Sequence, residues 1–345
     1  MLDRDRYWDC LDQAVQASSG GRIDEALAWL DEALKHNPSG AEAHNGRGEI
    51  LWDHGRHDEA LREFNRATEV QPDFHPAQLN RVELLVEEFG EHEQALELCD
   101  ALLGQSLEPH IEAEVYYLKA KALFYLDDLE GALFLLRRAL QVQGDMAVFR
   151  GFEGQILFEL GDFELALRSL ERADALEGES AHTVYHLALV LEHLGHPEEA
   201  QEHFERAAEL QPEVYPAPVR LAPEAFERAA HEAVGSLPEM VRQYVANCPI
   251  LVEGLPQLEL LLAENLSPQI LGLFQGTPAT EPGASPTMGS EPRTDLDRIL
   301  LFKGNLEKVA RSHEELVEQI QITVKHEIGH YLGLEEDDLD RLGLG

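Results

Sequence analysis

Residues 41–72 read AEAHNGRGEILWDHGRHDEALREFNRATEVQP, and this stretch decides the fold of the first two thirds of the chain. Small residues at Gly48 and Ala60 allow two paired helices to approach closely, while Phe64 fills the gap to the next pair. Pro72 ends the second helix because proline cannot continue one. The stretch therefore predicts a unit of two helices joined by a turn.

The same unit recurs along the chain. Alanines mark it at equivalent positions, namely Ala26, Ala60, Ala95, Ala132, Ala166 and Ala200. Successive alanines in this series are 34, 35, 37, 34 and 34 residues apart. A period of this length is typical of arrays in which each helix pair buries its apolar face against the next pair. We therefore predict an all-α solenoid of about six repeats over residues 1–214.

These features resemble the tetratricopeptide repeat family over about residues 7–214. The resemblance implies a superhelix of antiparallel helix pairs with a concave groove that binds a peptide or a protein. First-helix residues facing the groove would contact that ligand, and they include Asn45, Glu49, Asn80 and Glu83. These residues form no basic clamp for a carboxylate terminus, so the sequence does not specify the partner.

Charge excludes two classes of partner. The chain of 345 residues carries 66 acidic and 27 basic side chains, a formal net charge of -39. Such a chain repels phosphates, so we expect it to bind neither nucleic acid nor an anionic membrane surface. No apolar run approaches the roughly 18 residues that a membrane helix requires.

Cysteine usage and the N-terminus predict the compartment. Cys10, Cys99 and Cys248 are far apart and show no CxxC spacing, which is typical of reduced, buried thiols rather than of a disulfide framework. The first ten residues carry charges where a signal peptide needs an apolar stretch. We therefore expect a cytoplasmic protein.

The sequence changes character after Pro212. Residues 215–222 are rich in proline and predict a hinge, and residues 223–345 predict a second domain. Helical patterning over 223–247 is interrupted at Leu237-Pro238, and strands are expected at 250–252, 271–274 and 298–302. A loop is expected at 276–294. Ser312 and Glu315 form a capping box at the start of a further helix.

That last helix leads into residues 326–336, which read HEIGHYLGLEE. Residues four apart lie on one face of a helix, so His326 and His330 can bind one Zn²⁺. Glu327 lies beside them and can accept a proton from water at the metal. Gly333 then allows the chain to turn, so that an acidic residue just beyond it can supply a third ligand.

Residues 223–345 look like the small zincin-like metallopeptidases of bacteria. The stretches that carry the likeness are 250–253 (ILVE), 271–276 (LGLFQG), 298–302 (RILLF), 323–330 (TVKHEIGH) and 339–343 (LDRLG). The resemblance implies a small α+β domain in which a few-stranded sheet packs against the active-site helix. It also implies Glu336 as the third zinc ligand, with Asp337 as the alternative.

The sequence thus predicts a zinc-dependent metallopeptidase whose repeat array recruits a protein substrate or a regulator. The alternative is an interaction adaptor or scaffold whose zincin-like domain is inactive or only structural. An intact Glu327 favours the enzyme, because a structural site has no use for a base there. His182 and His186 are also four apart on an expected helix, but no acid completes a metal set, so we interpret them as packing residues.

Overall fold

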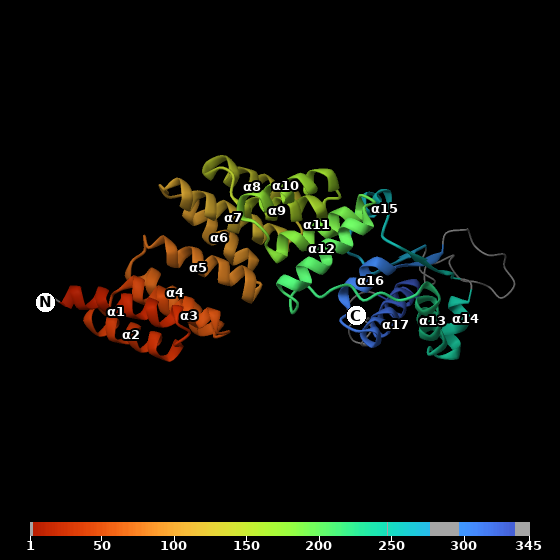
Figure 1. Cartoon of the computed structure of the whole chain (residues 1–345), viewed down its shortest axis with the longest axis horizontal. Coiled ribbons are helices and arrows are strands. Elements are labelled where there is room, and N and C mark those ends of the chain that lie inside the picture. The colour runs from red at the N-terminus through yellow and green to blue at the C-terminus, as the bar shows by residue number, and fades with distance from the viewer. Residues whose placement is uncertain (1–2, 247, 277–296, 335–345) are drawn as a thin grey trace. The chain divides into compact units, whose positions relative to one another are not determined.

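The computed structural model describes residues 3–246, 248–276 and 297–334 (Figure 1). The chain divides into two compact units, Met1–Phe149 and Arg150–Gly345. Among the described residues, no helix is both long and apolar enough to cross a membrane. The three cysteines are free and buried, as predicted. The domain boundary at 215–222 stays a prediction.

The first unit consists of helices that pack in sequential pairs. Its helices are α1 (Asp3–Ser19), α2 (Ile23–His36), α3 (Ala41–Asp53), α4 (His57–Val70), α5 (His75–Leu84), α6 (His92–Leu103), α7 (Pro109–Tyr125) and α8 (Leu129–Gln143). A π-helical turn, Leu85–Phe89, follows α5 in the third repeat. Helix α9 (Ala147–Glu159) crosses the division between the units. The predicted helical array is confirmed.

The small-residue pattern has the packing role that the sequence predicted. All six repeat-marking alanines are at most 1 % exposed. The ring of Phe64 is fully buried and lies so close to Gly48 that a Cβ atom there would overlap it. The glycine in α3 therefore makes room for the aromatic ring of α4.

The residues expected to face the groove are joined to one another. Asn45 is buried and donates to Glu49 (2.8 Å), and Asn80 donates to both Asn45 and Glu49 (3.0 Å each). Glu83 lies 3.5 Å from the Lys121 ammonium. These contacts tie α3, α5 and α7 together through polar side chains.

The second unit contains the last repeats and a small mixed domain. Its remaining helices are α10 (Phe163–Glu177), α11 (Ala181–His193), α12 (Pro197–Leu210), α13 (Pro223–Gly235), α14 (Glu239–Val245), α15 (Leu258–Glu264), α16 (Lys303–Val309) and α17 (His313–Tyr331). Its strands are β1 (Ile250–Glu253), β2 (Gly272–Gln275) and β3 (Arg298–Phe302). All three strands lie within one residue of their predicted bounds. Helices α15 and α16 were not predicted, because seven residues are too few to display a helical period.

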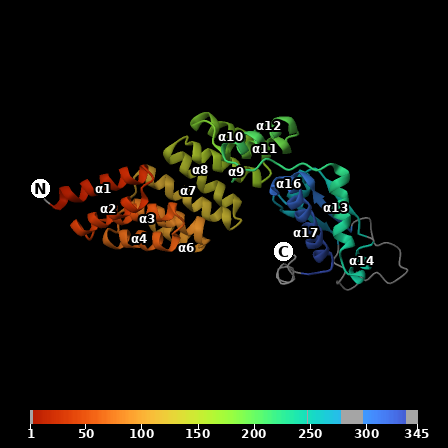
Figure 2. The same ribbon diagram turned by 60° about the horizontal axis from the view of Figure 1, so that its bottom comes forward.

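The sheet has the order β1-β3-β2, with β3 parallel to β1 and antiparallel to β2. Helices α13 and α17 lie side by side and pack with the sheet around one apolar core (Figure 2). On α17 the core residues Leu316, Ile320, Val324 and Ile328 recur every four residues. The Ser312 hydroxyl caps α17 by accepting from the Glu315 amide (3.1 Å), as predicted. The core thus fixes the helix that carries the histidines.

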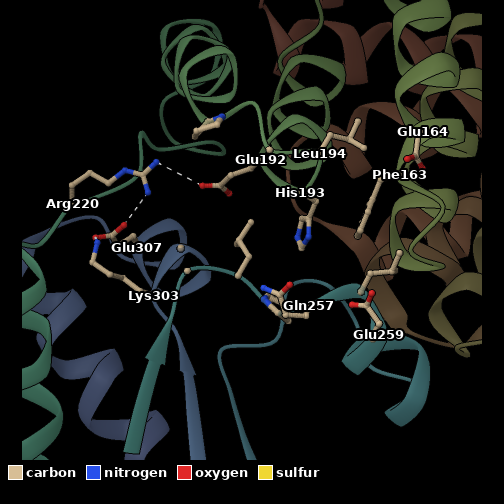
Figure 3. A pocket seen from close by; sticks show the side chains of 17 residues that line it. Phe163, Glu164, Glu192, His193, Leu194, Arg220, Gln257, Glu259, Lys303 and Glu307 are labelled. Atoms are coloured by element: carbon tan, nitrogen blue, oxygen red, sulfur yellow. Dashed lines mark hydrogen bonds and ion pairs between the residues drawn. The ribbon is translucent and has the colours of Figure 1, made fainter.

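Within this unit, the last repeats contact the mixed domain through charged side chains. We call this contact the internal interface, formed by α10–α12 on one side and by residues 254–270 and α16 on the other. Lys308 of α16 pairs with Glu192 of α11. Arg220 lies 2.9 Å from Glu307 and 3.9 Å from Glu192 (Figure 3). A cavity of about 870 Å³ opens beside these pairs.

Candidate metal centre

The two histidines of the motif converge on one side of α17. The Nε2 atoms of His326 and His330 are 2.9 Å apart, and their rings meet at 82°. Both side chains are half-buried. In a tetrahedral site with Zn–N distances of 2.0–2.1 Å, two ligand nitrogens lie about 3.3 Å apart. The pair therefore fits the donor set and the spacing that zinc needs, with a small rearrangement.

Glu327 has a different environment from the histidines on either side of it. Its side chain is only 6 % exposed. The Oε2 atom accepts a hydrogen bond of 2.6 Å from the backbone N–H of Phe274 in β2. A carboxylate this buried is costly unless it is hydrogen-bonded, so the contact with β2 stabilises it.

One face of α17 carries the contacts with β2. Thr323, Glu327 and Tyr331 are four residues apart and therefore share that face. The ring of Tyr331 is buried against the ring of Phe274, with centroids 5.4 Å apart and planes at 71°. Burial raises the pKa of Tyr331. Tyr331 is thus a core residue of this face.

The turn predicted after the histidines is confirmed. Gly333 has a φ of +76°, a left-handed conformation that favours glycine at the end of a helix. Its amide donates to the His330 carbonyl (2.9 Å), and the Leu334 amide donates to that of Gly329 (3.0 Å). The expected third ligands, Glu336 and Asp337, lie outside the described residues, as do most of the expected loop at 276–294 and the stretch 339–343. Within the part of the chain that is described, no group of three His, Cys, Asp or Glu side chains converges.

Family comparisons assign both parts of the chain. Residues 245–345 match the zincin-like metallopeptidase family. Tetratricopeptide repeat models match residues 11–73, 50–107, 113–145, 147–172 and 181–214. The chain is a tetratricopeptide repeat array followed by a zincin-like metallopeptidase domain. No curated protein matches the sequence.

Solved structures resemble the repeat array in fold. The Pseudomonas aeruginosa pilF structure is 14 % identical with a TM-score of 0.52, over 61 % of this chain and 94 % of that one. PilW, a type IV pilus biogenesis factor, is 18 % identical with a TM-score of 0.54, over 60 % and 94 %. Cut9-Hcn1 of the APC/C is also 18 % identical with a TM-score of 0.54, over 60 % and 40 %. At these identities the likeness shows the helical repeat fold alone.

Other candidate groups have structural roles. The Nδ1 atom of His186 contacts the His182 carbonyl (2.9 Å), and the Nδ1 atom of His182 contacts the Tyr215 hydroxyl (3.0 Å). Burial lowers the pKa of His186 to about 3, so this side chain is neutral at pH 7. The cavity at the internal interface includes neither His326 nor His330 among its lining residues.

The residues that the sequence did not single out are those of β2. The Phe274 amide reaches Glu327 from 53 positions away in the chain, and a backbone group has no residue type to mark it. Gly272 and Phe274 do fall in the stretch 271–276 that carries the zincin-like resemblance. That resemblance was therefore the sequence signal that could have pointed to β2 as part of the site.

Proposed function

We propose that the chain is a zinc-dependent metallopeptidase that hydrolyses peptide bonds, with the repeat array recruiting a protein substrate or a regulator. One observation supports this most: the convergent Nε2 atoms of His326 and His330 lie on the helix that carries the buried carboxylate of Glu327. A purely structural zinc site has no use for a carboxylate base at that position. The family match of residues 245–345 supports the same reaction class.

In this proposal, His326 and His330 hold one Zn²⁺ together with Glu336, and Asp337 is the alternative third ligand. When bound, the zinc supplies a Lewis acid that polarises the substrate carbonyl and lowers the pKa of water. Glu327 accepts a proton from the attacking water and then passes it to the leaving amine. The hydrogen bond from Phe274 keeps this carboxylate in one orientation.

The alternative function is an interaction adaptor whose zincin-like domain is inactive or only structural. The tetratricopeptide repeats support protein or peptide binding under either reading. We also propose a cytoplasmic location, which the three free, buried thiols support.

Zinc stoichiometry tests the proposal first. We expect one zinc per chain in the wild type and in Glu327→Gln, and loss of zinc in His330→Ala and Glu336→Ala. A peptide-library digest should then show cleavage by the wild type and none by Glu327→Gln. If the wild type held no zinc after refolding with the metal, the metallopeptidase would be ruled out and the adaptor function would remain. If zinc is retained in Glu336→Ala but lost in Asp337→Ala, the third ligand is Asp337 and not Glu336.

A further inference from the structure

Alternate residues of β2 direct their backbone N–H and C=O groups to opposite sides of the strand. The Leu271 carbonyl accepts from the Phe302 amide of β3 (2.9 Å), which makes these opposed residues a hydrogen-bonded pair. Such pairs alternate along an antiparallel ladder, so Leu273 also bonds to β3 while Gly272 and Phe274 point away from it. Because β2 is an edge strand of the described sheet, the Phe274 N–H points to the open edge. The sheet ladder therefore leaves this donor available for α17.

The carboxylate of Glu327 accepts the hydrogen bond from this amide. Its Oε2 atom lies 2.6 Å from the Phe274 nitrogen, which is a short bond for an amide and a carboxylate. One oxygen of the carboxylate is thereby fixed to a strand that belongs to the domain core. Rotation of the carboxylate about its terminal bond would break this hydrogen bond.

Gly272 supplies the space that this contact needs. A Cβ atom at position 272 would lie 2.7 Å from Thr323 Cγ2 and 3.1 Å from both Cγ and Oε1 of Glu327. The first distance is shorter than carbon atoms tolerate, and the buried Thr323 side chain has little room to move aside in a close-packed interior. Glycine at this position therefore lets α17 lie close enough to β2 for Glu327 to reach the Phe274 amide.

We propose that β2 positions the proton-transferring carboxylate. The Phe274 N–H fixes Oε2 of Glu327, and Gly272 sets the distance between strand and helix. Gly272 and Phe274 are positioning residues, since they act through Glu327. This inference rests on the proposed function for its catalytic consequence, whereas the hydrogen bond and its fit can be tested without activity.

Gly272→Ala is the decisive variant, with Gly254→Ala as its matched control. A Cβ atom at Gly254 would meet no described atom within 4 Å. We expect Gly272→Ala to bind one zinc per chain and to keep its KM, while kcat falls about 10- to 100-fold, the range for a catalytic group displaced by up to 1 Å. Gly254→Ala should leave kcat unchanged. Adding Thr323→Ser to Gly272→Ala removes the clashing methyl and should restore most of kcat.

Amide hydrogen exchange of residues 272–275 gives a readout that needs neither metal nor substrate. In the metal-free wild type the Phe274 amide should exchange slowly, and Glu327→Ala should accelerate it at least about tenfold, because an edge amide without an acceptor opens to solvent. Glu327→Gln keeps an acceptor oxygen and should fall between the two. Gly272→Ala should accelerate exchange, and Thr323→Ser should reverse this.

Two results would overturn the inference: Phe274 exchange that is indifferent to Glu327→Ala, or a Gly272→Ala variant with wild-type kcat and exchange. A general loss of structure in Gly272→Ala would appear as faster exchange throughout α17 and β3, in which case the Glu327→Ala comparison decides. If the wild type bound no zinc and cleaved nothing, the proposed function would fail, yet the exchange data would still report whether β2 holds Glu327.

Discussion

Replacing Lys308 by methionine should destabilise the second unit while leaving the first unit intact. The Lys308 side chain is 5 % exposed and that of Glu192 is 12 % exposed, so the ion pair at the internal interface is withdrawn from water. Burial lowers the pKa of Lys308, and the paired Glu192 only partly offsets this effect. The Nζ atom of Lys308 also lies over the buried ring of Phe204, 5.6 Å from its centroid. Methionine keeps most of that apolar stem and removes the charge.

The magnitude follows from what the substitution leaves behind. Removing one partner of a buried pair costs about 3–5 kcal/mol, because the other charge stays buried without compensation. Here Arg220 lies 3.9 Å from Glu192 and retains part of the attraction. We therefore expect a loss near the lower end, about 3 kcal/mol. Lys308→Met combined with Glu192→Gln should recover part of it, because no uncompensated charge remains.

The chain provides a built-in way to assign the effect to one unit. All three tryptophans, Trp8, Trp29 and Trp52, belong to the first unit, so their fluorescence in a guanidinium titration follows that unit. Far-UV circular dichroism follows both units. Lys308→Met should shift only the part of the dichroism transition that fluorescence does not report.

The control is a cation–carboxylate pair that is exposed to solvent rather than buried. Arg206 and Glu179 pair on the surface of the last repeats, with side chains 44 % and 51 % exposed. Arg206→Met should leave the dichroism transition unchanged, because exposed pairs contribute little. A Lys308→Met variant whose free energy of unfolding stays within about 0.5 kcal/mol of the wild type, the range of ordinary surface substitutions, would refute a stabilising role for the buried pair.

Three further outcomes are expected. Gly48→Ala should lower the free energy of unfolding, followed by tryptophan fluorescence, by about 1–3 kcal/mol because the new methyl group overlaps Phe64. Gly46→Ala in the same helix should raise it by up to about 1 kcal/mol, because the new Cβ atom would meet its nearest neighbour, a Leu30 methyl group, at 3.6 Å. Burial lowers the pKa of His193 to about 4, so between pH 6.5 and 4 the unfolded chain binds more protons than the folded chain. The second unit should therefore lose stability as the pH falls through that window, as thermal melts at pH 7 and pH 5 would show. The loss should be smaller in His193→Phe. Chelation should lower the dichroism melting temperature of the wild type but not its fluorescence transition, and His330→Ala should abolish the difference.

The features predicted from the sequence are those that repeat or that follow a local rule. The alanine series predicted the array because each repeat makes the same small-residue contact, as at Gly48 and Phe64. The Ser312 cap and the turn at Gly333 depend on neighbouring residues only, and both were correct. Short strands were located from apolar runs bounded by turn residues. The short helices of the second unit offered no such regularity.

The contacts that were not predicted join residues far apart in the chain. Lys308 and Glu192 are 116 positions apart, and neither differs in sequence from the many exposed charges of an acidic protein. Their pairing depends on how α16 meets α11, which only tertiary packing decides. The same applies to Glu327, for which the motif gives a role but not an orientation. Its partner is a backbone amide that the sheet register directs to the open edge.

Helix α17 shows why a motif and a fold must be read together. Its four-residue repeat from Leu316 to Ile328 buries one stripe in the core, which fixes the rotation of the helix about its axis. With that rotation fixed, Glu327 can only face β2, and His326 and His330 must lie together on the side that remains half-buried. A polar substitution of Ile320, well away from the histidines, would release the rotation and should therefore weaken zinc binding without touching a ligand. The separation of base and ligands is thus a property of the apolar stripe as much as of the motif.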